Sequence, residues 1–377
     1  MMKHKVCVLT TVHFWNDNRV YYKEVLSLKK LGYDVIYVAN NCVGNVDPDI
    51  NAINIDKDTN TIRRILSFLK TFNIVKNLDC EVVHFHDPEL IPTGLLLKLF
   101  TNKKVVYDVH EDYPSQMLTK YYLPWYVRKP LHKIMKFLEW LSGKSFDHII
   151  VADQAVYKHF PTRKTTILFN YPSIEKLSEA DKNLKNIIKE YDIIFPGSMA
   201  KFTAKLILNI MKKAKEQGKV LRCLLISPFK FDGGKEWVER TAYDLEIKEN
   251  LTLMDRIPPY EVPLYLTKTR VGLIPLPDTP KMHSNIPTKM FEYMYYKLPV
   301  ITGDLPPCGY FMRKDEYGFL VKCDSVEEYT DKILYLLNNP TVLASYGEKG
   351  HELVIKKYNW EKEEYKLKNV YNKLLEK

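Results

Sequence analysis

The sequence predicts an α/β protein made of two doubly wound parallel-sheet domains that face a central cleft. In both halves of the chain, short apolar runs alternate with helical patterns, as expected for parallel strands covered by helices. The chain of 377 residues is also long enough for two domains with separate cores. The strands expected in the first half are residues 6–10, 35–39, 82–85, 105–108 and 148–152. Those expected in the second half are residues 193–196, 221–227, 251–254, 271–276 and 300–302.

The boundary between the domains is predicted near residues 171–191, a polar and charged stretch between two strand-rich regions. We therefore expect a first domain at 1–172, a linker at 173–190, a second domain at 191–355 and a C-terminal helix at 356–377. Helical patterns are clearest at residues 21–31, 90–100, 326–338 and 360–375.

The composition is that of a soluble globular protein, with 46% hydrophobic and 27% charged residues. No apolar run approaches the roughly 18 to 20 residues of a membrane span. The apolar run after the basic N-terminal residues is too short for a signal peptide and fits a first strand, so we expect a cytoplasmic protein. The six cysteines form no CxxC pair, which favours reduced thiols and argues against a metal site.

The most informative segment is SNIPTKMFEYMYYKLPVITGD, residues 284–304. It follows the apolar run 271–276, so the order is strand, loop, helix, strand. Pro287 suits the first turn of a helix, and we expect the helix to open at residues 286–288. That start would lie at the carboxyl end of a parallel sheet, where open α/β sheets bind ligands.

Lys289 and Glu292 share one face of this predicted helix. The cation would neutralise a diphosphate, and the carboxylate would accept hydrogen bonds from the hydroxyls of a ribose. A nucleotide is therefore the predicted ligand. The alternative is an ordinary ion pair on the helix surface.

The stretch PTKMFEYMYYKLPVIT resembles the donor-binding segment of the retaining glycosyltransferases of family 4, which have the two-domain GT-B fold. The resemblance covers nearly the whole chain. It implies that the first domain binds the acceptor, that the second binds a UDP- or GDP-linked sugar, and that the C-terminal helix crosses back to the first domain. It also implies hexosyl transfer with retention, without a cofactor and without a metal.

The second domain departs from the family pattern at two places. The arginine–glycine position of the family falls on Thr203 and Ala204, so Lys201 or Lys205 is expected to substitute, unless both are solvated helix lysines. The first glutamate of the family pair falls on Ser284, which leaves Glu292. The expected donor-binding residues are Lys201, Lys205, Ser284, Asn285, Ile286, Pro287, Thr288, Lys289 and Glu292.

The loop after the first strand, TVHFWNDNR, contains no glycine, which argues against a dinucleotide site. Relatives place a glycine pair there for the donor diphosphate. Asp17 and Arg19 are candidates for that task, because arginine can bind phosphate with a planar fork. The alternative is that Asp17 caps the following helix.

Polar residues follow two more strands of the first domain. His86 and Asp87 come after VVHF, and His110, Glu111 and Asp112 come after KVVYDV. Such residues line a cleft at the sheet edge, or else the aspartates cap the next helices. The resemblance implies that His110 is the active-site histidine that contacts the transferred sugar. With Lys289 and Glu292 it completes the expected catalytic set.

Residues 118–144 interleave basic and aromatic side chains, a pattern typical of helices at the membrane interface. The alternative is an ordinary helix packed on its own domain through Ile134, Phe137, Leu138 and Leu141. The charge of +10 carries no nucleic-acid motif. We expect peripheral association with the inner face of the cell membrane, through Lys120, Trp125, Arg128, Lys129, Lys133 and Lys136.

These observations favour a glycosyltransferase that extends a lipid-linked acceptor or a polysaccharide in cell-surface polysaccharide biosynthesis. Two other hypotheses remain open. One is a nucleotide-sugar epimerase of the same fold, which would need no acceptor. The other is a catalytically silent homologue that binds donor or lipid and scaffolds polysaccharide assembly, as the departures at Thr203, Ala204 and Ser284 would allow.

Overall fold

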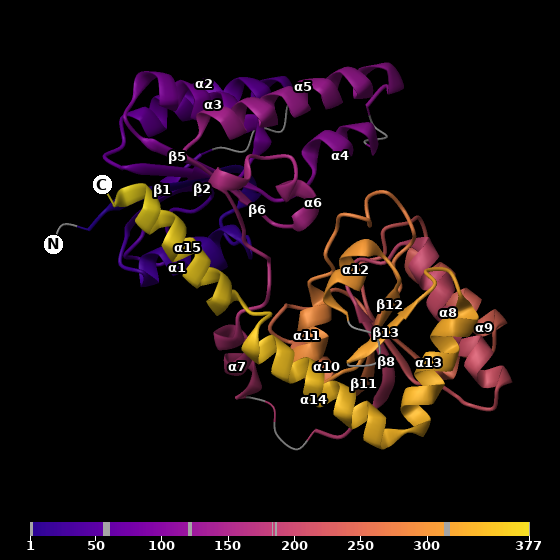
Figure 1. The fold of residues 1–377 in the computed structure, drawn as a ribbon. Helices are drawn as coiled ribbons and strands as arrows, with labels where there is room; N and C mark the ends of the chain where they lie inside the picture. Colours follow the sequence, from indigo (N-terminus) through magenta and orange to yellow (C-terminus); the bar gives the residue numbers. More distant parts are fainter. Residues whose placement is uncertain are drawn as a thin grey trace. The chain divides into compact units, whose positions relative to one another are not determined.

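The computed structural model describes residues 3–55, 61–119, 123–182, 184, 187–312 and 317–376. The chain folds as two compact units (Figure 1). The first unit contains Met1–Asn170 and Trp360–Lys377, and the second contains Tyr171–Asn359. The segment 173–190, expected as a linker, lies in the second unit and forms helix α7 (Ile174–Asp181).

The first unit is built on a parallel sheet with the strand order β3-β2-β1-β4-β5-β6-β7. The order reverses between β1 and β4, so this pair is the topological switch point of the sheet. The strands are β1 (Lys5–Phe14), β2 (Asp34–Asn40), β3 (Asn51–Asn54), β4 (Val82–Phe85), β5 (Lys104–Val109), β6 (His148–Val151) and β7 (Thr165–Ile167).

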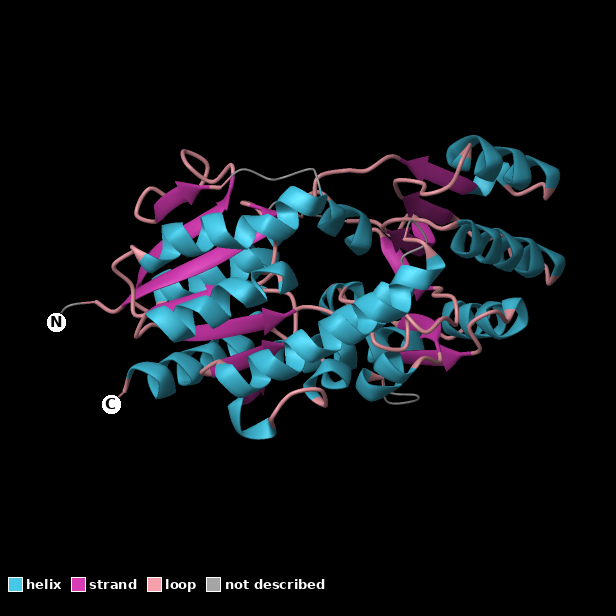
Figure 2. Ribbon diagram, turned by 90° about the horizontal axis from the view of Figure 1, so that it is seen from above, coloured by secondary structure: helices cyan, strands magenta, loops and turns pink. Residues whose placement is uncertain are grey.

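Helices cover both faces of this sheet (Figure 2), because alternate residues of its buried strands are apolar on both sides. One face packs against a π-helical turn η1 (Val20–Val25), α1 (Leu26–Lys30) and α15 (Trp360–Leu375). The other packs against α2 (Thr61–Lys76), α3 (Ile91–Phe100) and α5 (Trp125–Ser145). Shorter helical segments complete the unit: η2 (Pro88–Leu90), α4 (Tyr113–Thr119), α6 (Gln154–Tyr157) and η3 (Thr162–Lys164).

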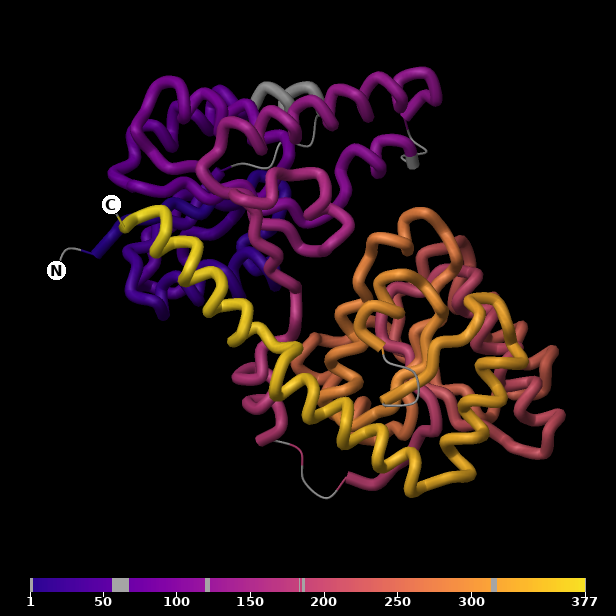
Figure 3. The backbone as a smooth tube through the Cα atoms, viewed as in Figure 1, coloured from indigo at the N-terminus to yellow at the C-terminus, as the bar shows by residue number. Residues whose placement is uncertain are grey.

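The C-terminal helix α15 belongs to the first unit, although it follows the whole of the second in the chain (Figure 3). Apolar side chains of α15 join the core of the first unit. The indole N–H of Trp360 donates to Ser27 Oγ at 2.9 Å, and Glu363 Oε2 accepts from the backbone N–H of Phe169 at 3.0 Å. The Tyr371 hydroxyl lies 2.9 Å from His84 Nδ1. Side chains at both ends of α15 therefore bond to the first unit.

The second unit has a six-stranded parallel sheet in the order β10-β9-β8-β11-β12-β13, with its switch point between β8 and β11. The strands are β8 (Tyr191–Pro196), β9 (Cys223–Ile226), β10 (Leu251–Met254), β11 (Thr269–Ile274), β12 (Val300–Gly303) and β13 (Gly318–Val321). Besides α7, the helices are α8 (Lys201–Glu216), α9 (Gly234–Asp244), η4 (Lys248–Asn250), α10 (Val262–Thr267), α11 (Lys289–Tyr295), α12 (Pro306–Phe311), α13 (Val326–Asn338) and α14 (Pro340–Lys356).

The predicted pair of doubly wound parallel sheets is confirmed. Three strands were not predicted, namely β3, β7 and β13, and each lies at the edge of its sheet. Strands β3 and β7 contain polar residues, because an edge strand is covered less completely than a central one. Strand β13 is apolar and mostly buried, so this reason does not apply to it. Within the described residues, no helix is long and apolar enough to cross a membrane.

Candidate functional site

In the second unit, Lys289 spans the switch point of the sheet. It opens α11, and its ammonium donates to the carbonyl oxygen of Pro196, the last residue of β8, at 2.5 Å. The ammonium also lies 4.4 Å from the centre of the Phe195 ring. A helix that follows β11 thus places a cation over the carboxyl end of β8.

Gly197 makes this position possible. Its φ is +136°, in the region that favours glycine, and a Cβ built on it would lie 2.2 Å from the Lys289 Nζ. The lysine is half-buried, and this burial lowers its pKa to about 8, while Glu292 on the same helix acts in the opposite direction. The site therefore holds a poorly solvated cation that a bound anion would stabilise.

The other predicted donor residues lie in the turn before α11. The helix begins at Lys289 with Thr288 as its N-cap, so it opens later than the predicted 286–288; the turn at Pro287 is closed by the Met290 N–H. Helix ends commonly differ by one or two residues. Ser284 bonds the Lys281 carbonyl at 3.4 Å, Asn285 and Thr288 are exposed, and Ile286 and Glu292 are half-buried.

The first departure from the family pattern, at Thr203 and Ala204, lies in α8, and both side chains are buried. Thr203 is buried and donates to the Pro275 carbonyl at 3.0 Å, and Ala204 is fully buried. Lys201 and Lys205 lie one turn apart on the exposed face, and Lys201 Nζ is 5.2 Å from the Trp237 ring centre. Both lysines are accessible to solvent, which agrees with the alternative that they are solvated helix lysines.

In the first unit, Asp87 links β4 to β1 at the corresponding switch point. Its Oδ2 accepts hydrogen bonds from the Thr10 hydroxyl at 2.8 Å and from the backbone N–H groups of Thr11 and Val12 at 2.6 and 3.2 Å. Asp87 makes no side-chain cap to the helix that follows it, so the capping interpretation is wrong for this residue. A carboxylate thus takes two amides in the last part of β1 that could otherwise bind a phosphate.

Asp17 and Arg19 both form hydrogen bonds with other groups of the protein. Asp17 accepts from the backbone N–H groups of Arg19 and Val20, at 2.8 and 3.0 Å, so it caps η1. Burial opposes its ionisation, but hydrogen bonds from His13 and Val20 outweigh burial and hold its pKa below the usual range. Arg19 is buried, with Nε and Nη2 on Asp108 at 2.8 and 2.9 Å. The structure contradicts the hypothesis that Arg19 binds donor phosphate.

His86 and His110 lie beside this arginine. His86 is buried, and its Nδ1 is 3.2 Å from His110 Nε2 and 3.3 Å from Asp108 Oδ2. His110 is half-buried, with its Nε2 3.1 Å from Asp108 Oδ2. Glu111 is exposed, and Asp112 caps α4 through the Ser115 N–H at 3.0 Å.

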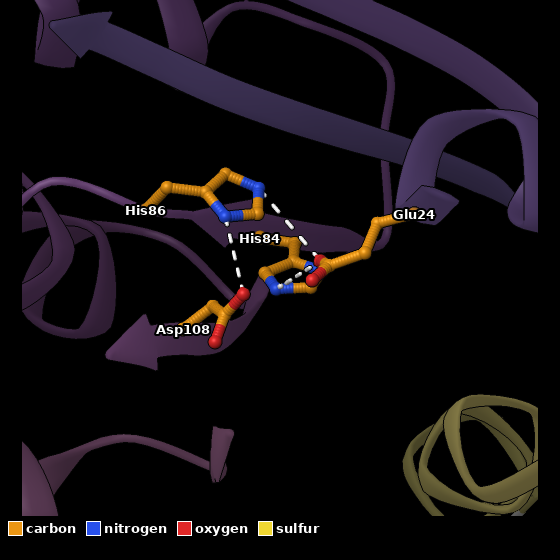
Figure 4. Close-up of side chains that lie close together, drawn as sticks. All are labelled: Glu24, His84, His86 and Asp108. Atoms are coloured by element: carbon orange, nitrogen blue, oxygen red, sulfur yellow. Dashed lines mark ion pairs between the residues drawn. The ribbon is translucent and has the colours of Figure 1, made fainter. Parts of the chain in front are cut away.

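Four buried groups of the first unit could serve as metal ligands, and Figure 4 shows how they lie. One ligand atom from each of Glu24, His84, His86 and Asp108 falls within 4.8 Å of the others. The Arg19 Nε, however, lies 2.8 Å from Asp108 Oδ2 and 3.1 Å from Glu24 Oε1. The guanidinium already supplies the cation between the two carboxylates, so this set does not fit a metal ion well.

The surface of α5 exposes large apolar side chains between basic ones. Ile134 and Phe137 are 53% and 57% exposed, so the interpretation of both as core residues is wrong. Phe137 stacks on Trp140, which is itself exposed. Trp125, Lys129, Lys133 and Lys136 are exposed as well, whereas Arg128 is half-buried and bonds the Leu123 carbonyl. Lys120 lies outside the described residues.

Two family models match the chain in sequence. Residues 18–166 match the model described as Glycosyltransferase Family 4, and residues 178–356 match the model described as Glycosyl transferases group 1. The first match lies within the first unit and the second match lies within the second unit. Together the two matches show the pair of domains of a family 4 enzyme. The chain belongs to the family 4 glycosyltransferases.

Solved structures show that the fold is GT-B. Sucrose-phosphate synthase from Thermosynechococcus elongatus has a TM-score of 0.72 at 15% identity, covering 99% of both chains. A glycosyltransferase from Rickettsia africae has a TM-score of 0.71 at 15% identity, again covering 99% of both. Anabaena HepE, in complex with UDP and glucose, has a TM-score of 0.70 at 9% identity and covers 98% of this chain and 100% of that chain.

Two curated proteins are similar in sequence. A poly(ribitol-phosphate) alpha-N-acetylglucosaminyltransferase from Staphylococcus aureus is 34% identical over 85 residues, which is 22% of this chain and 17% of that protein. A trehalose synthase from Pyrococcus horikoshii is 24% identical over 279 residues, 66% of this chain and 64% of that protein. The matches thus span less than two thirds of either relative.

Sequence reasoning missed four residues that shape these sites. Gly197 carried one usable signal, a glycine directly after a predicted strand, where a phosphate or a side chain can approach the backbone. His84 and Asp108 lie within predicted strands, two residues before His86 and His110, so the two-residue period of a strand places each pair on one face. Glu24 lies in a helical pattern and had no local signal.

Proposed function

We propose that the protein transfers a sugar from a nucleotide-sugar donor to a lipid-linked or polysaccharide acceptor, with retention, in the synthesis of a cell-surface polysaccharide. The observation that carries this proposal is the half-buried ammonium of Lys289 at the switch point of the second sheet. Breaking a glycosidic bond to a diphosphate leaves negative charge on that diphosphate. A cation already aimed at this position stabilises the transition state without reorganising.

The donor is assigned to the second unit because of the contrast between the two switch points. In the first unit, Asp87 binds the amides of Thr11 and Val12 in the last part of β1 and adds negative charge. In the second, Lys289 adds positive charge. Glu292, one turn along α11, is proposed to bind the ribose hydroxyls. Anabaena HepE, a neighbour of the same fold, is solved with UDP and with UDP-glucose, which supports a UDP-linked donor.

The chemistry proposed for this site uses positioning and charge, without a cofactor or metal ion. The acceptor oxygen attacks on the face from which the diphosphate leaves, and a diphosphate oxygen takes the acceptor proton. Lys289 stabilises the leaving group, and His110 contacts the transferred sugar. Both are catalytic residues in this proposal.

A membrane surface is proposed as the place of reaction. On α5, exposed lysines alternate with the exposed Phe137 and Trp140, and such a face binds anionic lipid with its aromatic rings at headgroup depth. The acceptor named in the Staphylococcus aureus relative, poly(ribitol-phosphate), supports a polymeric acceptor. We therefore propose peripheral association with the inner face of the cell membrane.

The test is release of nucleoside diphosphate by the purified protein with a panel of UDP- and GDP-linked sugars, with and without membrane lipid extract. We expect one donor to react, the extract to stimulate the reaction, and Lys289→Ala to lower kcat by roughly 100-fold or more. Lys212→Ala, an exposed lysine of α8, serves as the matched control. Equal losses in both variants would remove the assigned role of Lys289.

A second candidate is a catalytically silent homologue that binds donor and scaffolds polysaccharide assembly. The observation that favours it is the burial of Thr203 and Ala204, since neither can replace the basic residue of the family at a phosphate. Donor binding to the wild-type protein without release, with every extract and acceptor supplied, would favour this candidate.

A further inference from the structure

Two cysteines of the first unit lie near the amino ends of neighbouring strands, at the end of the sheet opposite to Asp87. Cys7 belongs to β1, and Cys80 comes two residues before β4. Both are free thiols, and their side chains are close enough to form a hydrogen bond. Cys7 is fully buried, whereas Cys80 is 7% exposed. Cys80 is therefore the more accessible residue of the pair.

Lys103, the residue before β5, places its ammonium beside Cys80. Its Nζ donates to the carbonyl oxygens of Leu78 and Cys80, at 2.5 and 3.0 Å, and lies 3.6 Å from Cys80 Sγ. The two carbonyl oxygens hold the cation in place, so its position does not depend on the thiol. A fixed cation beside a sulfur atom favours the thiolate over the thiol.

Cys7 and Lys103 act in the same direction on the Cys80 thiol. The hydrogen bond from Cys7, together with Lys103, lowers the pKa of Cys80 to about 7, although burial and the charge of Asp79 oppose this shift. Asp79 is itself paired with Lys5 at 2.6 Å. The same hydrogen bond raises the pKa of Cys7 well above its usual range. At neutral pH the pair thus combines a thiolate at Cys80 with a thiol at Cys7.

A second pair of cysteines, in the other unit, provides a comparison. Cys308 and Cys323 are buried in one small cluster. Burial raises the pKa of both thiols, that of Cys308 to about 11. The Cys308 Sγ lies 3.5 Å from the Thr302 hydroxyl, a neutral group. Burial alone therefore leaves a cysteine pair of this chain protonated, and the position of Lys103 distinguishes the first pair from the second.

We propose that Cys80 is a modification site for hydroperoxides and that Cys7 then closes it into a disulfide. The Cys80 thiolate attacks one peroxide oxygen, the O–O bond breaks, and the other oxygen leaves as hydroxide. The sulfur loses two electrons to the peroxide and becomes a sulfenic acid. The Cys7 sulfur then attacks the Cys80 sulfur, and the hydroxyl group leaves with the Cys7 proton as water. Neither step uses the donor site, so this inference is independent of the proposed function.

The test treats the reduced full-length protein with hydrogen peroxide and identifies the modified cysteines by peptide mass spectrometry. We expect a disulfide between Cys7 and Cys80, formed at least about tenfold faster than any oxidation of Cys308. In Cys7→Ser, the reaction should stop at the sulfenic acid of Cys80, which dimedone labels. In Cys80→Ser, neither the disulfide nor the labelled product should form.

Two lysine variants test the role of the cation. Lys103→Met should slow oxidation of Cys80 about tenfold, because the thiolate loses the charge that stabilises it. Lys104→Met is the matched control, since this neighbouring lysine is exposed and lies 3.6 Å from Asp147. It should react at the rate of the wild-type protein.

A measurement on the wild-type protein keeps the proposal testable if a variant fails to fold. The rate at which iodoacetamide alkylates Cys80 should rise with pH and level off above about 7, because the thiolate is the nucleophile. The rate for Cys308 should still be rising at pH 9, below the pKa of about 11 of that thiol.

Three results would overturn the proposal: equal rates of oxidation at Cys80 and Cys308, a wild-type protein that forms no disulfide between Cys7 and Cys80, or an unchanged rate in Lys103→Met. All of these measurements are made without nucleotide, sugar or acceptor. Failure of the proposed sugar transfer would therefore leave this result standing, and the reverse also holds.

Discussion

The two units have the same kind of sheet but opposite charges at its switch point. In the first unit, Asp87 follows β4, and its carboxylate accepts hydrogen bonds from Thr10, Thr11 and Val12 in the last part of β1. In the second, Lys289 is the first residue of α11, and its ammonium donates to the last residue of β8. The charge of Asp87 would repel a diphosphate, and the charge of Lys289 would attract one. The proposed function rests on this difference between the two units.

The units also differ in how their charges are compensated. In the first, Arg19 pairs with Asp108 in a buried network that also contacts His86 and His110. In the second, Lys289 is held by a carbonyl oxygen and an aromatic ring, neither of which carries a full negative charge. The first arrangement stabilises a fixed geometry, whereas the second leaves a poorly solvated cation that an anionic ligand would stabilise.

The largest effect is expected from removing the Asp87 carboxylate, which links β4 to β1 at the switch point of the first unit. Asp87→Ala would leave the Thr11 and Val12 amides and the Thr10 hydroxyl without their acceptor, so the first unit should lose about 3 kcal/mol of stability. Hydrogen exchange of amides in β4 and β5 measures this locally. Asp79→Ala, which removes an exposed ion pair with Lys5, should leave the stability almost unchanged. An equal cost for both variants would contradict a structural role for Asp87.

The second prediction tests whether the missing side chain of Gly197 makes room for the Lys289 ammonium. Gly197→Ala places a methyl group where the Lys289 ammonium lies, and the flexible lysine should move away, so nucleoside diphosphate affinity should fall about tenfold. Gly218, at φ +82° with no atom within 4 Å of a built Cβ, is the matched control. Gly218→Ala carries the same kind of backbone strain and should leave the affinity unchanged, as calorimetric titration of both variants will show.

The third prediction concerns pH. The pKa of Lys289 is about 8, below the usual 10.5, so the ammonium is lost as pH rises through 8. The affinity for nucleoside diphosphate should then fall by about tenfold per pH unit above 8. The stability contribution has the opposite sign: it rises with pH between about 8 and 10.5, because the unfolded chain binds the extra proton.

Lys289→Arg is the control for this pH dependence. A guanidinium stays charged throughout the range, so the inflection near pH 8 should disappear even if the affinity itself is reduced. An inflection that persists in this variant would assign the titration to another group.

The smallest effect is expected on α5. Lys136→Ala should lower binding to phosphatidylserine-containing vesicles by about fivefold, since each basic residue near the surface contributes about 1 kcal/mol. The effect should vanish at high salt. Lys349→Ala, an exposed lysine of α14 in the second unit, should bind as the wild type does in a sedimentation assay. Equal binding by both variants would remove α5 from the membrane contact.

Several parts of the molecule were predictable from local patterns. Helices α13 and α15 begin and end at the predicted residues. The predicted strands lie within about two residues of the observed ones, except that β1 runs four residues past its predicted end. The segment around Lys289 was found because a proline, a cation and a buried strand follow one another within a few residues. Each of these signals is contained in a short window, so no knowledge of the fold was needed.

The sequence by itself determined the two parallel-sheet domains, the position of Lys289 beside a sheet edge, and the basic aromatic surface of α5. Only the tertiary structure decided which polar groups already have partners within the protein and which could bind a ligand. It paired Arg19 with Asp108 over 89 residues of chain, placed Tyr371 against His84 from the far end of the sequence, and set Gly197 under Lys289. The physical reason is that the charge of a side chain is a property of its own residue, whereas its burial and its partners depend on segments that folding brings together.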